Sequence, residues 1–463
     1  METEKPPSKS TIIPEITVFV SNLSEDVWPF IKNMSNRQKR LNEIEENAFL
    51  ADRDLFSLAQ ESRIILITPK RISTKFLNYF KNLFNIKNAE ILVPKKHTGE
   101  ICKDIIKDEI IINKLIKLAN SSKKLTLIPY STSLQFINLL DYLNKKGIST
   151  YTPESPLEED AWTVNFFGSK SGIRQLAQQA SGEEPDLIMP AGFICMGIED
   201  AARIAAKKYI KENGVVIKTN KGHSGAGVLI FRPNELSKKY TKTEKQILDI
   251  LKKDSYWEKF PIIIESLINI NPKIAGGFPN VEFKIQKNGK IEFLYFGGMR
   301  VTKDGVFKGM EINDDVISDR IETQIMDTGF FVGEKYSQAG YRGYFDIDFV
   351  AAKNGKVLVT ESNVRRTGAT HVYHTAAKLF GKDFLYDTYI FSRNTYPLKN
   401  EKSYSFTKIL KTLSPILWDK KKKEGVIIIS ENLLKQNKLA YVIFGNNKKR
   451  ALAIENKLEE LLN

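Results

Sequence analysis

Four oxygen-bearing side chains stand at alternate positions on two apolar runs: Asp346 and Asp348 on the first, Glu361 and Asn363 on the second. The Asn-Gly pair at 354–355 lies between the runs and predicts a β-hairpin with a two-residue loop. In that register Asp348 lies opposite Glu361, and Asp346 lies opposite Asn363. Residues two apart on a strand share a face, so all four side chains project to the same side.

Carboxylates placed directly opposite one another destabilise a strand pair, so a cation is expected between them. Carboxylate and amide oxygens are hard ligands that favour Mg²⁺, with Mn²⁺ as an alternative, over zinc. The other interpretation is a solvated polar face on a half-exposed hairpin. The next segment favours the metal site, because Arg365, Arg366 and the threonines after them are poor core material and suit an anion. His371 and His374 have no nearby third ligand, so no zinc site is expected.

A glycine-rich turn at 222–227 joins two apolar strands, and Lys218 lies near the end of the first strand. Gly225 and Gly227 would let backbone N–H groups approach a phosphate closely, and Ser224 would add a hydroxyl donor. Lys218 would reach the same phosphates as a point charge. The turn lacks the Gly-Lys-Ser/Thr ending of a P-loop. The alternative is an ordinary hairpin that needs glycine only for its positive φ.

The whole chain has 463 residues of ordinary globular composition, which suggests roughly three domains. Its two cysteines exclude a disulfide framework and favour a cytoplasmic location. We expect neither a signal peptide nor a membrane span, because the acidic, proline-containing start leads into no long apolar stretch. The net charge of +15 would suit a nucleic-acid-binding protein. The lysines and arginines are dispersed rather than clustered with aromatic residues, so no nucleic-acid partner is expected.

The elements that carry these residues belong to an α/β fold, with α+β character in the catalytic part. In residues 1–155, short apolar strands alternate with helices, which predicts a Rossmann-like parallel sheet. The expected strands are 16–21, 63–68, 90–93 and 124–129. No Gly-x-Gly-x-x-Gly follows the first strand, so no dinucleotide site is predicted. The proline- and acid-rich segment 151–160 is interpreted as a linker.

Residues 156–398 are expected to form a second domain. Its β-branched and aromatic strands with Asn-Gly turns predict antiparallel sheets, and about 197–270 would form a small lid subdomain. The expected helices are 171–180, 197–213, 237–252, 319–328 and 375–394. Residues 399–463 predict a small C-terminal α/β appendage.

Taken in order, these elements resemble the ATP-grasp superfamily of carboxylate-activating ligases. The matching parts lie within about residues 160–395 and are Lys218 with the 222–227 turn, a hinge strand at 261–267, and Asp348 with Glu361 and Asn363. Segment 361–371 is most similar to the Asn-x-Arg-x-Thr-Gly-x-Thr-His ending of the pheganomycin-type peptide ligases. Those enzymes also carry a Rossmann-like domain before the ATP-grasp domain, called the pre-ATP-grasp domain, and a small C-terminal α/β piece.

The resemblance implies that ATP phosphorylates a carboxylate and that an amine attacks the resulting acyl phosphate. The products would be an amide or peptide bond, ADP and phosphate. ATP and Mg²⁺ are the implied cofactors, and small-molecule or peptide acids and amines are the implied substrates. The resemblance also allows a homodimer. The alternative is an ATP-grasp ligase or carboxylase of another branch.

The resemblance also gives each candidate site residue a role. The metal ligands would be Asp348, Glu361 and Asn363. The ATP-binding residues would be Lys170, Lys218, Ser224, Gly225 and Gly227, with Glu265 and the backbone up to Leu267 on the adenine and Glu282 on the ribose. The catalytic candidates for stabilising the acyl phosphate are Arg365 and Arg300. For Arg300 the alternative is a salt bridge at a sheet edge.

Overall fold

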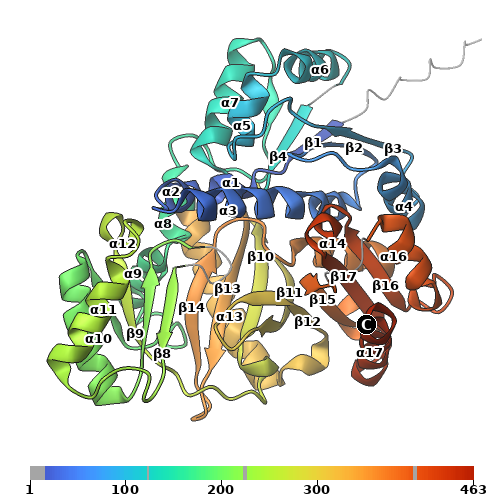
Figure 1. Ribbon diagram of the computed structural model, residues 1–463. Helices are drawn as coiled ribbons and strands as arrows, with labels where there is room; N and C mark the ends of the chain where they lie inside the picture. Colours follow the sequence, from blue (N-terminus) through green and yellow to red (C-terminus); the bar gives the residue numbers. More distant parts are fainter. Residues whose placement is uncertain (1–15, 123–124, 223–226, 400–403) are drawn as a thin grey trace, which may run out of the picture.

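The computed structural model describes residues 16–122, 125–222, 227–399 and 404–463, and these form three sheets (Figure 1). An N-terminal unit built on a parallel sheet lies at the top of the view, above a large mostly antiparallel sheet. A smaller sheet with its helices, in green, forms a lid beside the large sheet. In the described part of the chain, no helix is both long and apolar enough to cross a membrane.

The N-terminal unit has the expected parallel sheet, in the order β3-β2-β1-β4-β5. All five residues of the central strand β1 are buried, as expected for a strand covered on both faces. The strands are β1 (Ile16–Val20), β2 (Arg63–Ile67), β3 (Asn88–Leu92), β4 (Leu125–Pro129) and β5 (Thr150–Tyr151). The helices include α1 (Leu23–Asp26), α2 (Trp28–Lys32), α3 (Arg37–Leu50), the 3₁₀ helix η1 (Ala51–Leu58), α4 (Thr74–Phe84), α5 (Ile101–Ile106), α6 (Glu109–Asn120) and α7 (Leu134–Lys145).

A polar network closes the loop after β1, where a dinucleotide-binding protein would have its glycine turn. Asn22 donates to Glu25 (2.9 Å) and to the carbonyl of Ser131 (2.8 Å). Glu25 in turn accepts from the backbone N–H of Cys102 (2.7 Å) and from the hydroxyl of Ser133 (2.7 Å). These hydrogen bonds join the loop after β1 to the loop after β4 and to the start of α5.

The lid is a four-stranded antiparallel sheet in the order β6-β9-β7-β8, covered by helices. A row of four small residues on α10 lies buried, which lets α11 and the sheet pack closely: Ala201, Ala202, Ala205 and Ala206. The strands are β6 (Gly192–Cys195), β7 (Val215–Thr219), β8 (Val228–Phe231) and β9 (Ile262–Ser266). The helices here and just before it are α8 (Trp162–Phe167), α9 (Lys170–Gln179), α10 (Ile198–Glu212), α11 (Tyr240–Leu251) and α12 (Tyr256–Lys259).

The large sheet has eight strands in the order β14-β13-β10-β11-β12-β15-β17-β16. The long helix α13 (Asp319–Gln338) packs on β10 and β11, extending ten residues beyond its expected end at 328. The first five strands in chain order are β10 (Pro279–Ile285), β11 (Ile291–Val301), β12 (Phe307–Ile312), β13 (Gly343–Ala351) and β14 (Val357–Asn363).

The helix expected at 375–394 is wrong. The structure has α14 (Thr370–Phe380), the short α15 (Phe384–Asp387) and then strand β15 (Tyr389–Pro397). Gly381 follows α14 at a φ of 93°, a conformation that ends the helix and that L side chains rarely adopt. The β-branched and aromatic residues after α15 then join the large sheet.

The C-terminal tail continues the large sheet. It contains α16 (Phe406–Thr412), β16 (Gly425–Ser430), β17 (Lys438–Gly445) and α17 (Lys448–Leu462). β17 pairs with β15 and β16 pairs with β17, so the two tail strands extend the sheet at its β15 edge. The expected α/β elements are present, and their pairing ties the tail to the preceding domain.

Segment 151–160, which we interpreted as a linker, contains Glu154, which forms ion pairs with two residues of the following domain. Glu154 is 7% exposed and accepts two hydrogen bonds from Arg366, at 3.0 and 2.9 Å. It also accepts from Lys284 at 2.9 Å. Burial opposes ionisation of Glu154, but Arg366 and Lys284 outweigh it and lower its pKa. This contact fixes the N-terminal unit against the large sheet.

Glu154→Gln should therefore destabilise the protein strongly, because it leaves the buried Arg366 guanidinium without its counter-charge. We expect the free energy of unfolding in guanidinium chloride to fall by about 3–5 kcal/mol. The control is Glu424→Gln, which removes the carboxylate partner of the half-exposed Arg450 and should cost less than about 1 kcal/mol. Equal, small losses in both variants would contradict a structural role for the Glu154 pair.

Candidate active site

The acidic hairpin has the predicted register at its functional end, although its loop differs from the prediction. The N–H of Ala352 donates to the carbonyl of Lys356 (2.8 Å), so the loop has three residues, with Gly355 at a φ of 84°. That loop shifts the pairing by one residue. A β-bulge at Thr360, between the pairs Phe349–Val359 and Asp348–Glu361, shifts it back.

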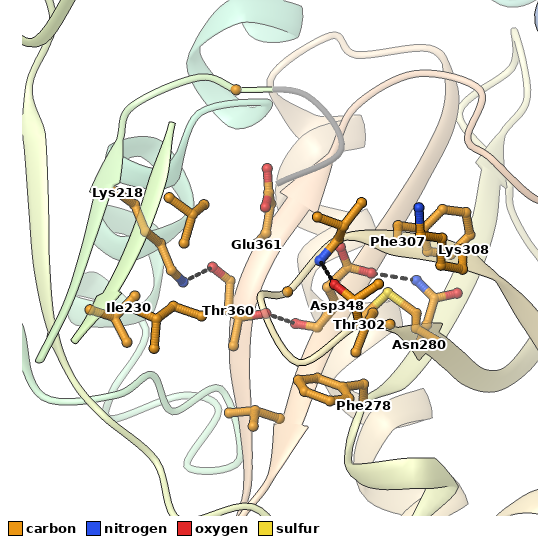
Figure 2. Close-up of a pocket in the computed structure, with 18 of the residues that line it drawn as sticks. Lys218, Ile230, Phe278, Asn280, Thr302, Phe307, Lys308, Asp348, Thr360 and Glu361 are labelled. Atoms are coloured by element: carbon orange, nitrogen blue, oxygen red, sulfur yellow. Dashed lines mark hydrogen bonds between the residues drawn. The ribbon is translucent and has the colours of Figure 1, made fainter. Parts of the chain in front are cut away.

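The bulge restores Asp348 opposite Glu361 and Asp346 opposite Asn363, as predicted. It also leaves Thr360 outside the strand pairing. The Thr360 hydroxyl donates to the carbonyl of Asp348 (3.1 Å), and the Thr360 carbonyl accepts from Lys218 Nζ (3.4 Å). In Figure 2, Lys218 thus reaches the hairpin from the lid strands.

Asn280 on the neighbouring strand β10 completes the acidic face. It pairs with Asp348, and its amide donates to Asp348 (2.7 Å) and Asp346 (3.2 Å). Asn363 donates to the other oxygen of Asp348 (3.2 Å). Burial, then Asp346 and Glu361, raise the pKa of Asp348 well above its ordinary value. Two aspartates therefore lie together on this face, and amide groups of Asn280 and Asn363 contact Asp348.

Two lysines from different elements reach acids that line the same cavity. Lys170, 3% exposed at the start of α9, forms an ion pair with Glu361 at 2.7 Å. Burial opposes ionisation of Glu361, but the Lys170 ammonium, and then Lys218, outweigh it and lower its pKa. Lys218 on β7 forms an ion pair with Glu265 at 2.7 Å, and Glu265 also binds Arg174 at 2.6 Å.

Arg365 connects the acidic face to the N-terminal unit. Its Nε donates to Asp26 (2.6 Å), and its Nη2 donates to the side-chain oxygen of Asn363 (3.0 Å). Burial opposes ionisation of Asp26, but Arg365, and then Lys221, outweigh it and hold the Asp26 pKa below its ordinary value. A fixed guanidinium thus lies directly beside the acidic strand.

A cavity of about 1000 Å³ extends between the lid sheet, the large sheet and the N-terminal unit. One end is lined by apolar side chains from both sheets, including Val216, Ile230, Leu267, Phe278, Met299 and Val350. Figure 2 shows Ile230 below Lys218 at the left, Phe278 below Asp348, and Phe307 and Lys308 to the right of Asp348. The cavity therefore has both apolar and charged lining, the combination that a purine base with phosphates requires.

The charged compartment fits a hard divalent cation by its donor chemistry. Asp348, Glu361 and Asn363 offer oxygens from one face, and a cation bound there would lie among the carboxylates of Asp346, Asp348 and Glu361. In the geometry present, no three His, Cys, Asp or Glu side chains among the described residues form a metal-binding group. Glu361 is bonded to Lys170, and Asp348 to the two asparagines.

Two candidates do not line the cavity as expected. Glu282 is fully buried beneath it and accepts hydrogen bonds from Tyr295 (2.6 Å), Thr367 (2.9 Å) and Thr370. Burial and Asp346 raise its pKa to about 7. A side chain with these partners is not available to a ribose.

Arg300 is the second correction. Its guanidinium forms a two-point ion pair with Glu455 on α17, at 2.7 and 2.9 Å, and lies over the Phe391 ring. It therefore fastens the C-terminal helix to the sheet, in line with the salt-bridge alternative. Arg300 is not among the residues that line the cavity, so its contacts do not support the expected catalytic role.

The remaining candidates divide by where they lie. Ser224 and Gly225 fall outside the described residues. Gly227 has a φ of 80°, and a Cβ there would fall 2.2 Å from Thr219 Cγ2, so only glycine fits. His371 is buried in α14, and His374, which is partly buried on the same helix, shares a hydrogen bond with the Tyr344 hydroxyl (2.8 Å). Burial lowers the pKa of both imidazoles well below the ordinary value.

Sequence reasoning missed several residues of the site. Asn280 stands two positions before Glu282 and so shares its face, a signal that strand alternation carries. Asp26 and Arg174 are partners that only the folded chain brings near Arg365 and Glu265. Arg53, in a segment otherwise rich in apolar residues, also lines the cavity.

Comparison with known proteins gives the fold. No protein-family model matches the chain. A curated relative, the L-propargylglycine–L-glutamate ligase of Streptantibioticus cattleyicolor, is 31% identical over 93 residues, which is 18% of this chain and 19% of that protein. The match thus spans about a fifth of the relative's length.

Solved structures match over nearly the whole chain at low sequence identity. Biotin carboxylase from Campylobacter jejuni, in complex with an ATP analogue, has a TM-score of 0.56 and 12% identity, covering 96% of this chain and 91% of that one. An ADP complex of N5-carboxyaminoimidazole ribonucleotide synthetase has a TM-score of 0.54 and 11% identity, covering 96% of both chains. The biotin carboxylase domain of Hydrogenobacter thermophilus 2-oxoglutarate carboxylase, a dimer with MgADP and bicarbonate, has a TM-score of 0.55 and 12% identity, covering 96% and 89%. The chain therefore has the fold of these ligase and carboxylase structures over nearly its whole length.

Proposed function

We propose that this protein is an ATP-dependent carboxylate–amine ligase that forms an amide or peptide bond through an acyl phosphate. The observation that carries the proposal is one cavity in which Lys170, Lys218 and Arg365 surround the acidic face of the β13–β14 hairpin. The curated relative supports the choice of substrates, since its name describes the joining of two amino acids.

The apolar compartment would take the adenine, with the backbone from Glu265 to Leu267 at its edge. Lys218 and Lys170 would bind phosphate oxygens as point charges, exchanging their present carboxylate partners for the ligand. Asp348, Glu361 and Asn363 would hold Mg²⁺, which supplies charge neutralisation at the transferred phosphoryl group. A homodimer stays a prediction.

Arg365 would stabilise the charge that develops as the carboxylate attacks the γ-phosphorus and ADP leaves. Its guanidinium is always protonated and is already fixed by Asp26, so little reorganisation is needed when the charge forms. The amine then attacks the acyl carbon, phosphate departs, and the amine loses a proton. Bound substrates that fill the cavity would keep water from competing for the acyl phosphate.

A carboxylase of another ATP-grasp branch is the second candidate, because the solved structures above are carboxylating enzymes by name. The deciding experiment incubates the protein with Mg²⁺, ATP and pools of amino acids and short peptides, with and without bicarbonate. ADP, phosphate and new amide masses are measured. Bicarbonate-dependent ADP release would favour the carboxylase, whereas AMP as product, or no substrate-dependent hydrolysis in any pool, would exclude the ligase.

Glu361→Gln should weaken the binding of Mg²⁺, because it replaces a charged oxygen ligand with a neutral one. We expect the Mg²⁺ concentration for half-maximal ADP release to rise at least about tenfold, the range seen even for outer ligands of metal sites. Glu334→Gln, at an exposed position on α13, is the matched control and should leave the Mg²⁺ titration unchanged. An unchanged titration in Glu361→Gln would remove it from the metal site.

Arg365→Ala should lower kcat by a few hundredfold with little change in KM for ATP. The loss corresponds to about 2.7–4 kcal/mol for one donor that acts on transition-state charge. Because Asp26 also loses its partner, the thermal unfolding of the variant is measured in parallel to separate misfolding from lost chemistry. Near-normal turnover in a folded variant would exclude the proposed role.

A further inference from the structure

Arg53 is a buried arginine that lines the cavity and has no protein counter-charge bonded to it. It lies on η1 in the N-terminal unit and is 3% exposed. Its Nε is buried without a hydrogen-bond partner. Within the described ranges, its guanidinium makes no ion pair and no side-chain hydrogen bond. Its sequence neighbour Asp54 acts on it only through the electrostatic field.

Arg365, which also lines the cavity, and two buried arginines whose partners or neighbours lie at it each have a bonded carboxylate. The ion-pair distances are 2.6–2.8 Å, for Arg174 with Glu265, Arg365 with Asp26 and Arg366 with Glu154. Arginine cannot escape the cost of burial by losing its proton, and a buried charge without a partner is strongly unfavourable. An arginine held in this state beside an open cavity is therefore suited to an anion that enters from outside.

The position of Arg53 separates it from the reacting centre. Arg365 contacts Asn363 on the acidic face and lies over the Tyr130 ring, 5.8 Å from its centre. Tyr130 is also within the electrostatic reach of Arg53. Arg53 and Arg365 thus both lie near Tyr130, but Arg53 has no hydrogen bond to the acidic face. An anion at Arg53 would lie near the reacting carboxylate without being that carboxylate.

A second unpartnered polar atom lines the same cavity. The side-chain oxygen of Asn394 is buried without a donor, while its amide donates to the carbonyl of Gly368 (3.0 Å). Gly368 lies two residues before the start of α14, and η1 packs against α14. This part of the cavity therefore holds a guanidinium and an amide oxygen, each with a buried atom that has no protein partner.

We propose that Arg53 binds a carboxylate that the reaction does not consume, and that Asn394 accepts an N–H of the same substrate. The substrate class is an amino acid or short peptide that retains a free carboxylate. That carboxylate belongs either to the amine acceptor or to a second acid group of the activated substrate. This inference rests on the proposed function for its substrates but is tested by binding alone.

The binding test compares each of the common L-amino acids with its primary carboxamide, by calorimetry, in the presence of Mg-ADP. The wild-type protein should bind the acid of at least one pair about 10–100-fold more tightly than its amide, the range for a charged hydrogen bond. Arg53→Met should abolish that preference, and Arg53→Lys should retain part of it. Arg37→Met, at an exposed position on α3, should keep it in full.

Equal binding of acid and amide in every pair, or a preference that survives Arg53→Met, would overturn the proposal, as would the absence of any amino-acid binding. If Arg53→Met does not fold, the comparison of acid with amide in the wild-type protein and in Arg53→Lys tests the proposal.

In turnover assays of the Arg53 variants, a raised KM for the amine assigns the carboxylate to the acceptor, and a raised KM for the acid assigns it to the activated substrate. Arg53-dependent binding without ADP release would contradict the ligase and leave this site standing. Ligation at the same rate with the acid and with its carboxamide would contradict this site and leave the ligase standing.

Discussion

The accumulation of carboxylates on one face of the β13–β14 hairpin is the constraint on which the active-site architecture depends. Like charges this close are unfavourable unless cations lie among them, and no cation is supplied by the hairpin's own face. Lys170 comes from α9, Lys218 from the lid, and Arg365 from the segment after β14, where Asp26 of the N-terminal unit fixes it. Balancing the charge therefore requires all three parts of the fold to meet at one place.

The sequence was sufficient where chemistry is local. Strand alternation placed the acids on one face, and the N-terminal parallel sheet followed from buried apolar runs. The hairpin register was correct for a reason that the sequence did not show: a three-residue loop shifted the pairing, and the bulge at Thr360 shifted it back. The prediction assumed a two-residue loop and regular pairing from that loop onward, so it included neither the longer loop nor the bulge.

Where partners lie far apart in the chain, sequence reasoning failed. Arg300 was a reasonable catalytic candidate until α17, 155 residues later, supplied Glu455. Glu282 was assigned to a ribose because of its place after the hinge, yet Thr367 and Thr370 occupy its oxygens. Segment 151–160 has the composition of a linker, but Glu154 within it pairs with an arginine 212 residues away. In each case the deciding interaction is a tertiary contact that composition and spacing do not encode.

The pairing of the cavity's cations also changes how the net charge of +15 relates to ligand binding. Lys170, Lys218 and Arg365 each already hold a carboxylate, so these three cations of the charged compartment are neutralised before a ligand binds. Under the proposed function, a nucleotide with its metal ion would enter by exchanging partners: phosphate oxygens replace carboxylates at the lysines, and the metal ion replaces the lysines at the acids. The ion pairs keep each group in place before the ligand arrives, which limits the reorganisation that binding requires. Recognition would then follow from the geometry of paired charges rather than from the excess of lysine on the surface.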